Sequence, residues 1–433
     1  MIAQAAALRH SAPAPLASRE IVVAPGDGIG PEITQAVLDV LAAADGGLVF
    51  RPVTVGLEAY RAGAAAGFGP EVMEAISAHG VMLKGPITTP QGGGYKSVNV
   101  SLRKGLGLYA NLRPCVAYHP FVPTRHPSMD VVIVRENEED TYAGIEHRQS
   151  DEVYQCLKLI TRPGCERIVR YAFEYASAHG RRKVTCMTKD NIMKLTDGLF
   201  HRVFDEIAAE YPALQSEHMI IDIGTAKMAV EPERFDVVVT PNLYGDILSD
   251  VAAEVAGSIG LAPSSNIGSQ SAMFEAVHGS APDIAGRDLA NPSGLLLSAV
   301  MMLVHLNRPE AATGIHNAWL RTLEDGIHTA DLHGKDRHRR PVGTRDFARA
   351  VMERLGARPR QLPAVEYPAR PALTPSASFA PARPVAKALK VLVGVDVFVH
   401  WNEAQRDPQV LGGQLEALAG PDFHLALVTN RGV

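Results

Sequence analysis

Two aspartates four residues apart, Asp246 and Asp250 in the run NLYGDILSD, are the side chains best suited to chemistry. On a helix this spacing puts both carboxylates on one face, about one turn apart, where they can share a divalent cation. Oxygen ligands favour Mg²⁺ or Mn²⁺ over zinc. Taken alone, however, such a pair most often marks a solvated helix face.

Two further features favour a metal site. The pair follows the apolar, β-branched run FDVVVT, so we expect it just past the carboxyl end of a strand, where open α/β sheets bind ligands. Asp222 ends another strand-like run, HMIIDIG, and is a third candidate ligand. Because Mg²⁺ takes few carboxylates and completes its shell with water or substrate, we predict a chelating substrate.

A second group of polar side chains follows a run of three glycines. Ser97, Asn99 and Arg103 recur on one side of a predicted helix. Arg113 and Arg135 stand at the ends of apolar runs, and arginine binds carboxylates bidentately. A single arginine would most often be an ordinary surface residue, but three near predicted strand ends indicate a substrate with several carboxylates.

Composition is typical of a large globular enzyme. The chain has 433 residues, 46% of them hydrophobic and 21% charged, which is enough for two or three domains. A net charge of −5 without a dense basic run argues against nucleic acid as a partner. The longest apolar stretch, residues 295–306, is too short for a bilayer and predicts a buried helix, so we expect no membrane anchor. Four cysteines without CxxC spacing favour a cytoplasmic location.

Strand-like runs alternate with helical patterns from about residue 21 to residue 348, which predicts an α/β fold with much parallel pairing. The turn PGDGIGPE lacks G-x-G-x-x-G spacing, so a tight strand-to-helix turn is preferred to a dinucleotide fingerprint. Residues 1–18 are predicted to be a disordered tail, and residues 359–385 a Pro/Ala-rich linker. Residues 386–433 resemble a β-α-β fragment too small to be stable alone.

Several ordered runs resemble the isocitrate and 3-isopropylmalate dehydrogenase family of β-decarboxylating enzymes over residues 20–358. They are GDGIGPE, KSVNVSLRK, YANLRP, VRENEEDTYAGIEH, TKDNIMKLTDGLF, NLYGDILSD, NIG and FEAVHGSAPDIAG. The resemblance implies two α/β domains around a cleft, a non-Rossmann nucleotide site and a homodimer with shared active sites. It assigns residues 19–115 and 258–358 to a large cofactor-binding domain, and residues 116–257 to a small domain with the dimer clasp and metal site. The last segment is similar to the start of an extra domain in longer bacterial members, truncated at Val433.

Within this family the pattern S-x-N-x-x-x-R, supplied by Ser97, Asn99 and Arg103, implies isocitrate as the substrate. Such polar groups would stay unpaired against the isopropyl group of isopropylmalate. The resemblance also implies that Asp246 and Asp250 of one subunit, with Asp222 of its partner, hold Mg²⁺ or Mn²⁺. It further implies that Arg103, Arg113 and Arg135 bind the substrate carboxylates.

The same resemblance assigns two catalytic residues. Lys189 would assist deprotonation of the substrate hydroxyl from the other subunit, and Tyr142 would protonate the enolate carbon to give 2-oxoglutarate, as in the tricarboxylic acid cycle. Asp190 is a departure, because many relatives carry a small residue there.

The residues implied to bind the cofactor are Thr88, Asn191, His278, Gly279, Ala281, Asp283, Ile284 and Asn291. NADP-using relatives place Lys and Tyr at the positions of Asp283 and Ile284, where they meet the 2′-phosphate. An aspartate there can accept hydrogen bonds from free ribose hydroxyls and repels a phosphate. At an effective dielectric constant of about 20, like charges about 4 Å apart cost on the order of 4 kcal/mol. We therefore predict NAD as the cofactor.

Two alternatives remain open. One is a homoisocitrate or 3-isopropylmalate dehydrogenase. The other is a non-catalytic regulatory subunit, although the presence of Tyr142, Lys189 and all three aspartates argues against that.

Overall fold

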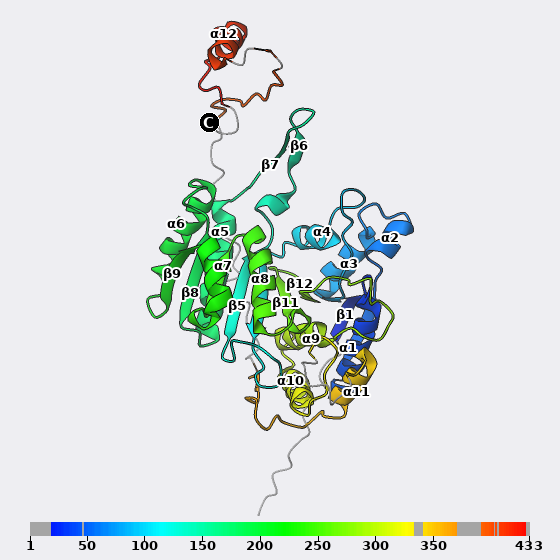
Figure 1. Cartoon of the computed structure of the whole chain (residues 1–433). Helices are drawn as coiled ribbons and strands as arrows, with labels where there is room; N and C mark the ends of the chain where they lie inside the picture. Colours follow the sequence, from blue (N-terminus) through cyan, green and yellow to red (C-terminus); the bar gives the residue numbers. More distant parts are fainter. Residues whose placement is uncertain are drawn as a thin grey trace, which may run out of the picture. The chain divides into compact units, whose positions relative to one another are not determined.

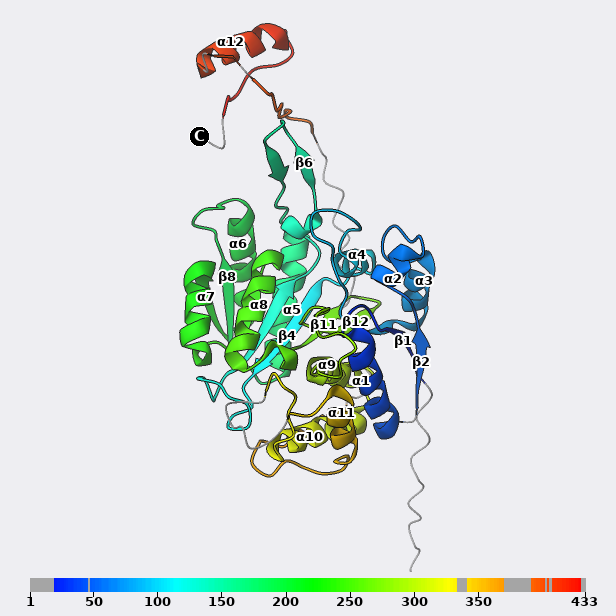
Figure 2. The ribbon, with the colours of Figure 1, turned by 45° about the vertical axis from the view of Figure 1, so that its right-hand side comes forward.

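The computed structural model describes residues 19–45, 47–332, 341–369, 391–401, 403–404 and 407–429 (Figures 1 and 2). It divides into two compact units. The first contains the chain up to Gly144 and then Leu157–Val385, and the second contains Ile145–Cys156 and the chain from Ala386. The predicted tail, residues 1–18, lies outside the described residues, as does the predicted linker after residue 369. The assignment of residues 19–358 to a large and a small domain stays a prediction.

A ten-stranded sheet forms the centre of the first unit, in the order β2-β1-β3-β12-β11-β4-β5-β10-β8-β9. Its strands are β1 (Arg19–Ala24), β2 (Leu48–Pro52), β3 (Val81–Lys84), β4 (Ala110–Val116), β5 (Asp130–Glu136), β8 (Lys183–Thr188), β9 (Gln215–Ile220), β10 (Val237–Thr240), β11 (Pro263–Ile267) and β12 (Ala272–Ala276). Neighbours run parallel except in the pairs β12–β11, β11–β4 and β4–β5. The predicted α/β class with much parallel pairing is confirmed.

Helices cover both faces of this sheet. They are α1 (Gly30–Ala44), α2 (Leu57–Arg61), α3 (Pro70–His79), α4 (Val98–Gly105), α5 (Arg162–Ala178), α6 (Thr196–Ala208), α7 (Ile221–Val230), α8 (Asn242–Ala256), α9 (Ser293–His305), α10 (Pro309–Glu324) and α11 (Thr344–Met352). Short 3-10 helices are η1 (Thr141–Ala143), η2 (Pro232–Arg234) and η3 (Ile259–Leu261). Figure 2 shows α5 to α8 around one half of the sheet and α1 to α4 around the other.

Alternation along the strands sorts the core into layers, because successive strand side chains point to opposite faces. On one face Val23 and Val132 join a core that includes α1, α5, α6, α9, α10 and α11. On the other face Val22 packs with α3 and α4, whereas Val131 packs with α7 and α8. The face that carries α4 and α8 therefore has two separate apolar cores with the central strands between them.

The turn between β1 and α1 is tight, as predicted. Gly28 has φ +58°, and a Cβ there would lie 2.0 Å from the carbonyl oxygen of Ser280. The Asp27 carboxylate accepts hydrogen bonds from the backbone N–H groups of Leu57 at 3.0 Å and Thr88 at 2.9 Å. The turn thus joins three segments that are distant in the sequence.

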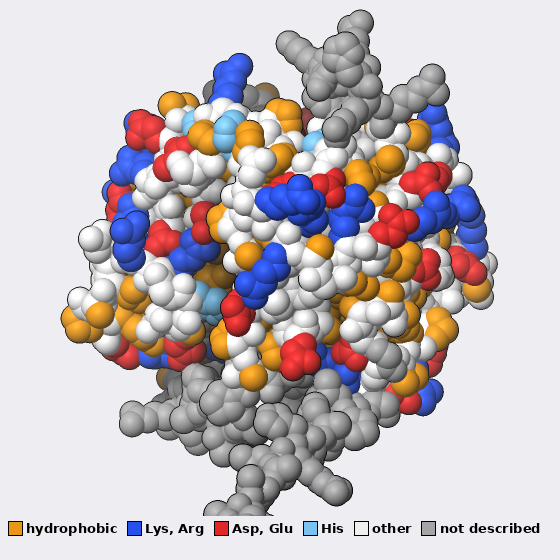
Figure 3. Space-filling view, turned by 90° about the horizontal axis from the view of Figure 1, so that it is seen from below, with side chains coloured by type: hydrophobic (Ala, Val, Ile, Leu, Met, Phe, Trp, Pro, Cys, Tyr) orange, Lys and Arg blue, Asp and Glu red, His pale blue; other side chains and the backbone are white. Residues whose placement is uncertain are grey.

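The predicted buried helix over residues 295–306 is confirmed, because α9 is buried along most of its length. None of the described helices is long and apolar enough to cross a membrane. All four cysteines are free thiols. On the face shown in Figure 3, acidic and basic side chains are interspersed.

The second unit contains the hairpin of β6 (Glu146–Arg148) and β7 (Tyr154–Cys156), and the helix α12 (Pro408–Ala419). The predicted helix of the C-terminal fragment is present, but the described residues on either side of it, 391–401 and 421–429, form no strand. The reason is that a strand needs a paired neighbour, whereas here Val393 is 97% exposed and Leu427 is 74% exposed.

Candidate active site

Charged side chains on four strands point to the face that carries α4 and α8. Side chains two residues apart on a strand point to the same face of the sheet. Arg135 is two residues from Ile133 and Arg113 is two residues from Cys115, and both apolar residues belong to the core packed against α8, so the two arginines point to that face. Lys84 and Glu275 are opposite each other on β3 and β12 and share the face of Met82 and Met273 in the α4 core. Strand periodicity thus gathers these charges between α4 and α8.

A cavity of about 330 Å³ lies over these strands. Its lining residues are Pro86, Ile87, Thr89, Ser97, Asn99, Val100, Arg103, Arg113, Arg135, Tyr142, Asp246, Glu275, Ala276, Val277, His278 and Gly279. It therefore brings together all five predicted substrate-binding residues, the predicted proton donor, one predicted metal ligand and part of the predicted cofactor loop.

One wall of the cavity is α4. Ser97 is its N-cap, with a side-chain oxygen that accepts from the Val100 N–H at 3.5 Å. Asn99 and Arg103 follow one turn apart. The buried Asn99 Oδ1 and Arg103 Nε have no hydrogen-bond partner among the described residues. Because buried polar atoms are nearly always paired, these atoms suit a polar ligand in the cavity.

Asp246 is the centre of the charged network. It lies in the first two turns of α8, and its Oδ1 accepts from Arg135 Nη1 and lies 3.2 Å from Arg113 Nη2. The Tyr142 hydroxyl donates to its Oδ2 at 2.5 Å. Burial raises the pKa of Asp246, but the two arginines outweigh it and hold the pKa below its ordinary value. Asp246 is therefore a carboxylate at neutral pH.

Asp250, one turn further along α8, completes the predicted acidic pair. Its side chain is 55% exposed, and its Oδ1 lies 3.6 Å from Arg113 Nη1. Burial raises the pKa of Asp250 despite the attraction of Arg113, and the charge of Asp246 raises it further. A divalent cation between the two carboxylates would relieve this repulsion. The all-oxygen donor set at the cavity edge fits Mg²⁺ or Mn²⁺.

Arg135 and Tyr142 pack against each other. Arg135 is buried, donates from Nε and Nη2 to Asn242 Oδ1, and has its guanidinium carbon 4.9 Å from the centre of the Tyr142 ring. Burial and the nearby Arg113 lower the pKa of Arg135 to about 9, so it stays cationic at neutral pH. Burial and then Asp246 raise the pKa of Tyr142, so the phenol keeps its proton.

The sequence did not point to Glu275, which lines the cavity, or to Lys84, its buried partner. Lys84 Nζ lies 2.6 Å from Glu275 Oε2, and Arg103 Nη2 donates to Glu275 Oε1 at 2.8 Å. Burial raises the pKa of Glu275, but the two cations hold it far below its ordinary range. Each of the apolar runs VMLK and AMFEA contains one charged residue. Because a buried charge needs a partner of opposite sign, the two charges could have been expected to pair.

Lys189 and Asp222 form a separate group. Lys189 Nζ donates to Asp222 Oδ2 at 2.9 Å, which lowers the pKa of Asp222. Across the described ranges no hydrogen bond or ion pair joins either residue to Tyr142, Asp246 or Asp250. The prediction that Asp222 ends a strand is wrong, since β9 stops at Ile220 and Asp222 is in the first turn of α7. The following GTAKMAV favours helix, which overrides the apolar run.

The predicted cofactor residues are only partly gathered. His278 and Gly279 line the cavity, and the Thr88 hydroxyl lies 2.7 Å from that of Ser280 in the same loop. Ala281 and Ile284 pack partly against the main core. Asn291 is buried and donates to Asp331, a structural contact, and Asn191 is exposed.

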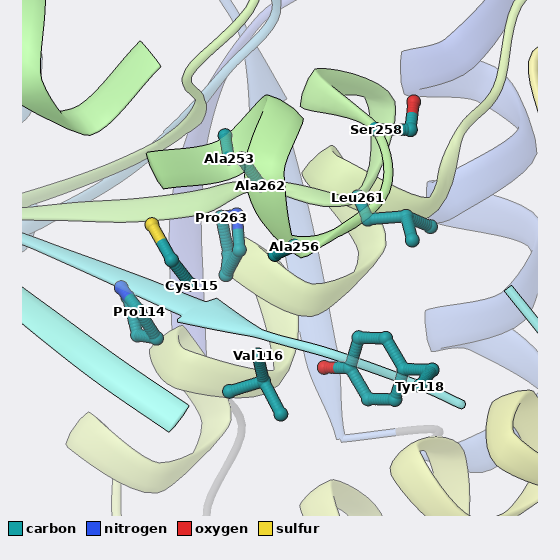
Figure 4. Close-up of a pocket in the computed structure, with 10 residues that line it drawn as sticks. All are labelled: Pro114, Cys115, Val116, Tyr118, Ala253, Ala256, Ser258, Leu261, Ala262 and Pro263. Atoms are coloured by element: carbon teal, nitrogen blue, oxygen red, sulfur yellow. The ribbon is translucent and has the colours of Figure 1, made fainter. Parts of the chain in front are cut away.

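A second, small cavity of about 20 Å³ lies beside β4 and the end of α8 (Figure 4). Its lining residues are Pro114, Cys115, Val116, Tyr118, Ala253, Ala256, Ser258, Leu261, Ala262 and Pro263. It has room for about one water molecule and contains no predicted site residue, so it is not a substrate site.

Known proteins share this chain's sequence and fold. It is 52% identical over 413 residues to "Isocitrate dehydrogenase [NADP]" of Rickettsia bellii, an alignment that covers 95% of this chain and 85% of the relative. The protein of the same name from Thermus thermophilus is 47% identical, over 95% of this chain and 82% of the relative. The crystal structure of isocitrate dehydrogenase from Methylococcus capsulatus has a TM-score of 0.75 and 44% identity, and covers 78% of this chain and 99% of that one.

The predicted preference for NAD is wrong by these comparisons. Five rickettsial relatives at 49% to 54% identity carry NADP in their names, whereas relatives from Dictyostelium discoideum and Arabidopsis thaliana with NAD in their names are 46% identical. The physical reason is that Asp283 is exposed in a turn. In bulk water, like charges about 4 Å apart cost only about 1 kcal/mol, and salt screens them further. One exposed acid therefore does not decide the cofactor.

Family models cover most of the sequence. A model described as isocitrate/isopropylmalate dehydrogenase matches residues 20–351. A second, described as the C-terminal domain of bacterial isocitrate dehydrogenase, matches residues 390–433. The chain belongs to the isocitrate/isopropylmalate dehydrogenase family.

Proposed function

We propose that this chain is an isocitrate dehydrogenase, which converts isocitrate and NADP⁺ to 2-oxoglutarate, CO₂ and NADPH with Mg²⁺ or Mn²⁺, as a homodimer. The observation that carries the proposal is the arginine-lined cavity with Tyr142 and Asp246 at its wall and Asp250 one turn away. The names of the relatives support the same reaction.

The charges of the cavity suit a tricarboxylate. Arg103, Arg113 and Arg135 provide three guanidiniums, each able to pair with a carboxylate. Asn99 and the Arg103 Nε offer polar atoms that are unpaired in the described structure. An isopropyl group at that wall would leave them buried without partners, at a cost of about 1–3 kcal/mol for each group. The cavity therefore favours isocitrate over isopropylmalate.

The metal ion would be held by Asp246 and Asp250, together with the partner's Asp222. When bound, it supplies positive charge that stabilises the deprotonated hydroxyl and the developing enolate. The chain's own residues provide orientation and protons. The arginines fix the carboxylates, and the Tyr142 phenol, protonated at neutral pH, is placed to deliver a proton at the cavity wall.

A homodimer with shared sites explains why the predicted catalytic residues fall into two groups. Lys189 and Asp222 contact each other, whereas Tyr142 and Asp246 line the cavity and Asp250 lies one turn further along α8. Large apolar side chains are exposed near both groups, among them Leu195 at 83%; the others are Ile192, Ile223, Val230 and Ile247. Ile223 and Val230 lie on α7 and Ile247 lies on α8, and these two helices pack against each other (Figure 1), whereas Ile192 and Leu195 lie in the loop before α6. A second copy would cover such a surface.

The cofactor loop offers a cation for a 2′-phosphate. Arg287 follows Asp283 by four residues in the same turn and is exposed. In nucleotide sites a nearby arginine accommodates the 2′-phosphate of NADP. We expect Arg287→Gln to raise KM for NADP⁺ while leaving KM for isocitrate unchanged. An unchanged KM for NADP⁺ would remove Arg287 from the cofactor site.

The function is tested with a matrix of activities at saturating Mg²⁺. Isocitrate, homoisocitrate and 3-isopropylmalate are each assayed with NADP⁺ and with NAD⁺. We expect the highest kcat/KM for isocitrate with NADP⁺. A higher value for isopropylmalate would overturn the substrate, a higher value with NAD⁺ would overturn the cofactor, and inactivity with every pair would favour a regulatory subunit.

A further inference from the structure

A cluster of metal-ligating side chains lies outside the cavity, on the loop after β8. Asp190, His201 on α6 and His218 on β9 each offer one ligand atom, and these atoms lie within 4.8 Å of one another. Asp190 Oδ2 is 2.7 Å from His201 Nδ1, and Asp190 Oδ1 is 3.8 Å from His218 Nε2. The two imidazole rings stack with centroids 3.5 Å apart. Three segments therefore converge on one carboxylate.

This arrangement differs from an ordinary His–Asp pair, because a second imidazole lies beside the same carboxylate. His218 Nε2 is hydrogen-bonded to the Thr188 hydroxyl at 2.9 Å, and a bound ion would replace that contact. Burial, and then the neighbouring His201, lower the pKa of His218, which favours its neutral form. Burial raises the pKa of Asp190, but the hydrogen bond from His201 and the nearby His218 outweigh it and lower the pKa. A carboxylate and a neutral imidazole are the forms that bind metal ions.

The surroundings also suit a metal ion. His201 presents Nδ1 to the cluster, and its other nitrogen, Nε2, lies 3.6 Å from Asp205 Oδ2. At 3.6 Å this contact is longer than a hydrogen bond. A carboxylate that closes on this side of a metal-binding histidine fixes the tautomer and raises the basicity of the ligand. With bonds of about 2.0–2.1 Å, ligand atoms around zinc stand roughly 3.3 Å apart. The two rings are stacked with 15° between their planes, so one imidazole must rotate about its side-chain torsions before both nitrogen lone pairs can point at one ion.

We propose that Asp190, His201 and His218 form a binding site for a divalent transition metal of the zinc class, separate from the carboxylate pair on α8. Two imidazoles and one carboxylate select Zn²⁺ or a similar ion over Mg²⁺. A bound ion would tie the loop after β8 to α6 and β9. Asp190 directly follows Lys189, so the ion would also hold the backbone beside the predicted catalytic lysine.

The experiment measures Zn²⁺ binding to the full chain by equilibrium dialysis, with excess Mg²⁺ to occupy the carboxylate pair. We expect one Zn²⁺ per chain, and weaker binding by at least about tenfold in His201→Gln and in His218→Gln, since even outer-sphere changes cost about 10–100-fold. His126→Gln is the matched control. His126 lies 3.2 Å from Glu233, a similar His–carboxylate contact without a second histidine, so its loss should leave Zn²⁺ binding unchanged.

Co²⁺ in place of Zn²⁺ gives a second readout, because its visible absorption reports nitrogen ligands and a low coordination number. We expect these bands in the unmodified chain and not in either histidine variant. Asp205→Asn addresses the case in which those variants fail to fold, since Asp205 is 67% exposed. It should weaken Zn²⁺ binding by about tenfold. The proposal would be overturned if the unmodified chain, Asp205→Asn and any folded histidine variant bound Zn²⁺ with equal affinity. It would also be overturned if Asp250→Asn alone lost Zn²⁺ binding.

Discussion

Asp250, a proposed metal ligand, makes few contacts with the rest of the fold. Its side chain is more than half exposed, and the one contact it makes in the ion-pair network is the long one to Arg113. We expect Asp250→Asn to change the free energy of unfolding by less than about 0.5 kcal/mol, as surface substitutions usually do. If Asp250 is a metal ligand, kcat should fall at least about 100-fold, because the ion contributes several kcal/mol.

Steady-state rates over a Mg²⁺ titration, with unfolding in urea, check this prediction. Glu254→Gln is the control, since Glu254 is an exposed acid one turn further along the same helix. A near-normal kcat for Asp250→Asn at ordinary Mg²⁺ concentrations would exclude Asp250 as a ligand.

Tyr142 is predicted to donate a proton to the substrate. Its hydroxyl donates to Asp246, and its pKa is raised above the ordinary value of 10.0, so the phenol remains protonated through the neutral range. The Tyr142→Phe change should lower kcat by about 10²–10⁴-fold, the usual contribution of a positioned acid, with little change in KM for isocitrate. In the unmodified chain, any loss of kcat from ionisation of this tyrosine should have its midpoint above pH 10.0.

A pH profile of kcat for both proteins gives the answer. An intact kcat in Tyr142→Phe, or a large increase in KM alone, would mean that the phenol positions substrate and does not donate the proton.

The turn between β1 and α1 contacts the loop predicted to bind the cofactor. The backbone N–H of Ile29 donates to the Ser280 carbonyl oxygen at 2.9 Å, the same atom that a Cβ on Gly28 would strike. We expect Gly28→Ala to destabilise the chain by more than about 1 kcal/mol, from the left-handed φ alone, and to raise KM for NADP⁺. Urea unfolding and cofactor titration measure the two effects.

Gly93→Ala is the matched control for this turn. A Cβ on Gly93 would meet no atom within 4 Å, and its φ is not in the left-handed range. Equal stability of the two variants would contradict the close approach of the turn to Ser280.

The sequence reveals such elements well where apolar periodicity is strong. The strands β1, β3, β5, β8 and β10 and the helices α1, α5 and α9 follow from it, and so does the place of Asp246 after β10. Asp222 was misplaced because MII continues an apolar pattern across the strand–helix boundary, where periodicity alone does not decide. The strands expected beside α12 are absent from the described residues because strand formation depends on a partner.

The arrangement of the residues around the cavity was harder to predict from the sequence. Its residue types were predicted, but Lys84 and Glu275 face each other only through the pairing of β3 with β12, two strands far apart in the chain. The same holds for the contact of Arg103 with Glu275. Such long-range register is a property of the assembled sheet.

At the scale of the whole molecule, the separation of Lys189 from Tyr142, the two proposed catalytic residues, predicts that inactive variants can complement each other. Lys189→Met and Tyr142→Phe should each be inactive alone. After subunit exchange, a hybrid dimer has one site with the intact Tyr142 of one chain and the intact lysine of the other. Random exchange of equal amounts should restore up to about a quarter of the unmodified activity, because half of the dimers are hybrids with one good site each.

The structure supplies the control for this experiment. Lys189 and Asp222 contact each other at 2.9 Å within one chain, so they should enter the same site together. A mixture of Lys189→Met with Asp222→Asn therefore never combines an intact lysine with an intact aspartate in one site, and it should stay inactive. Exchange is verified with differently tagged chains. Activity that returns in the first mixture but not in the second would indicate that Lys189 and Asp222 of one subunit together complete the active site of the other. No recovery in the first mixture, despite proven exchange, would mean that each chain builds its own site by bringing α7 to the cavity.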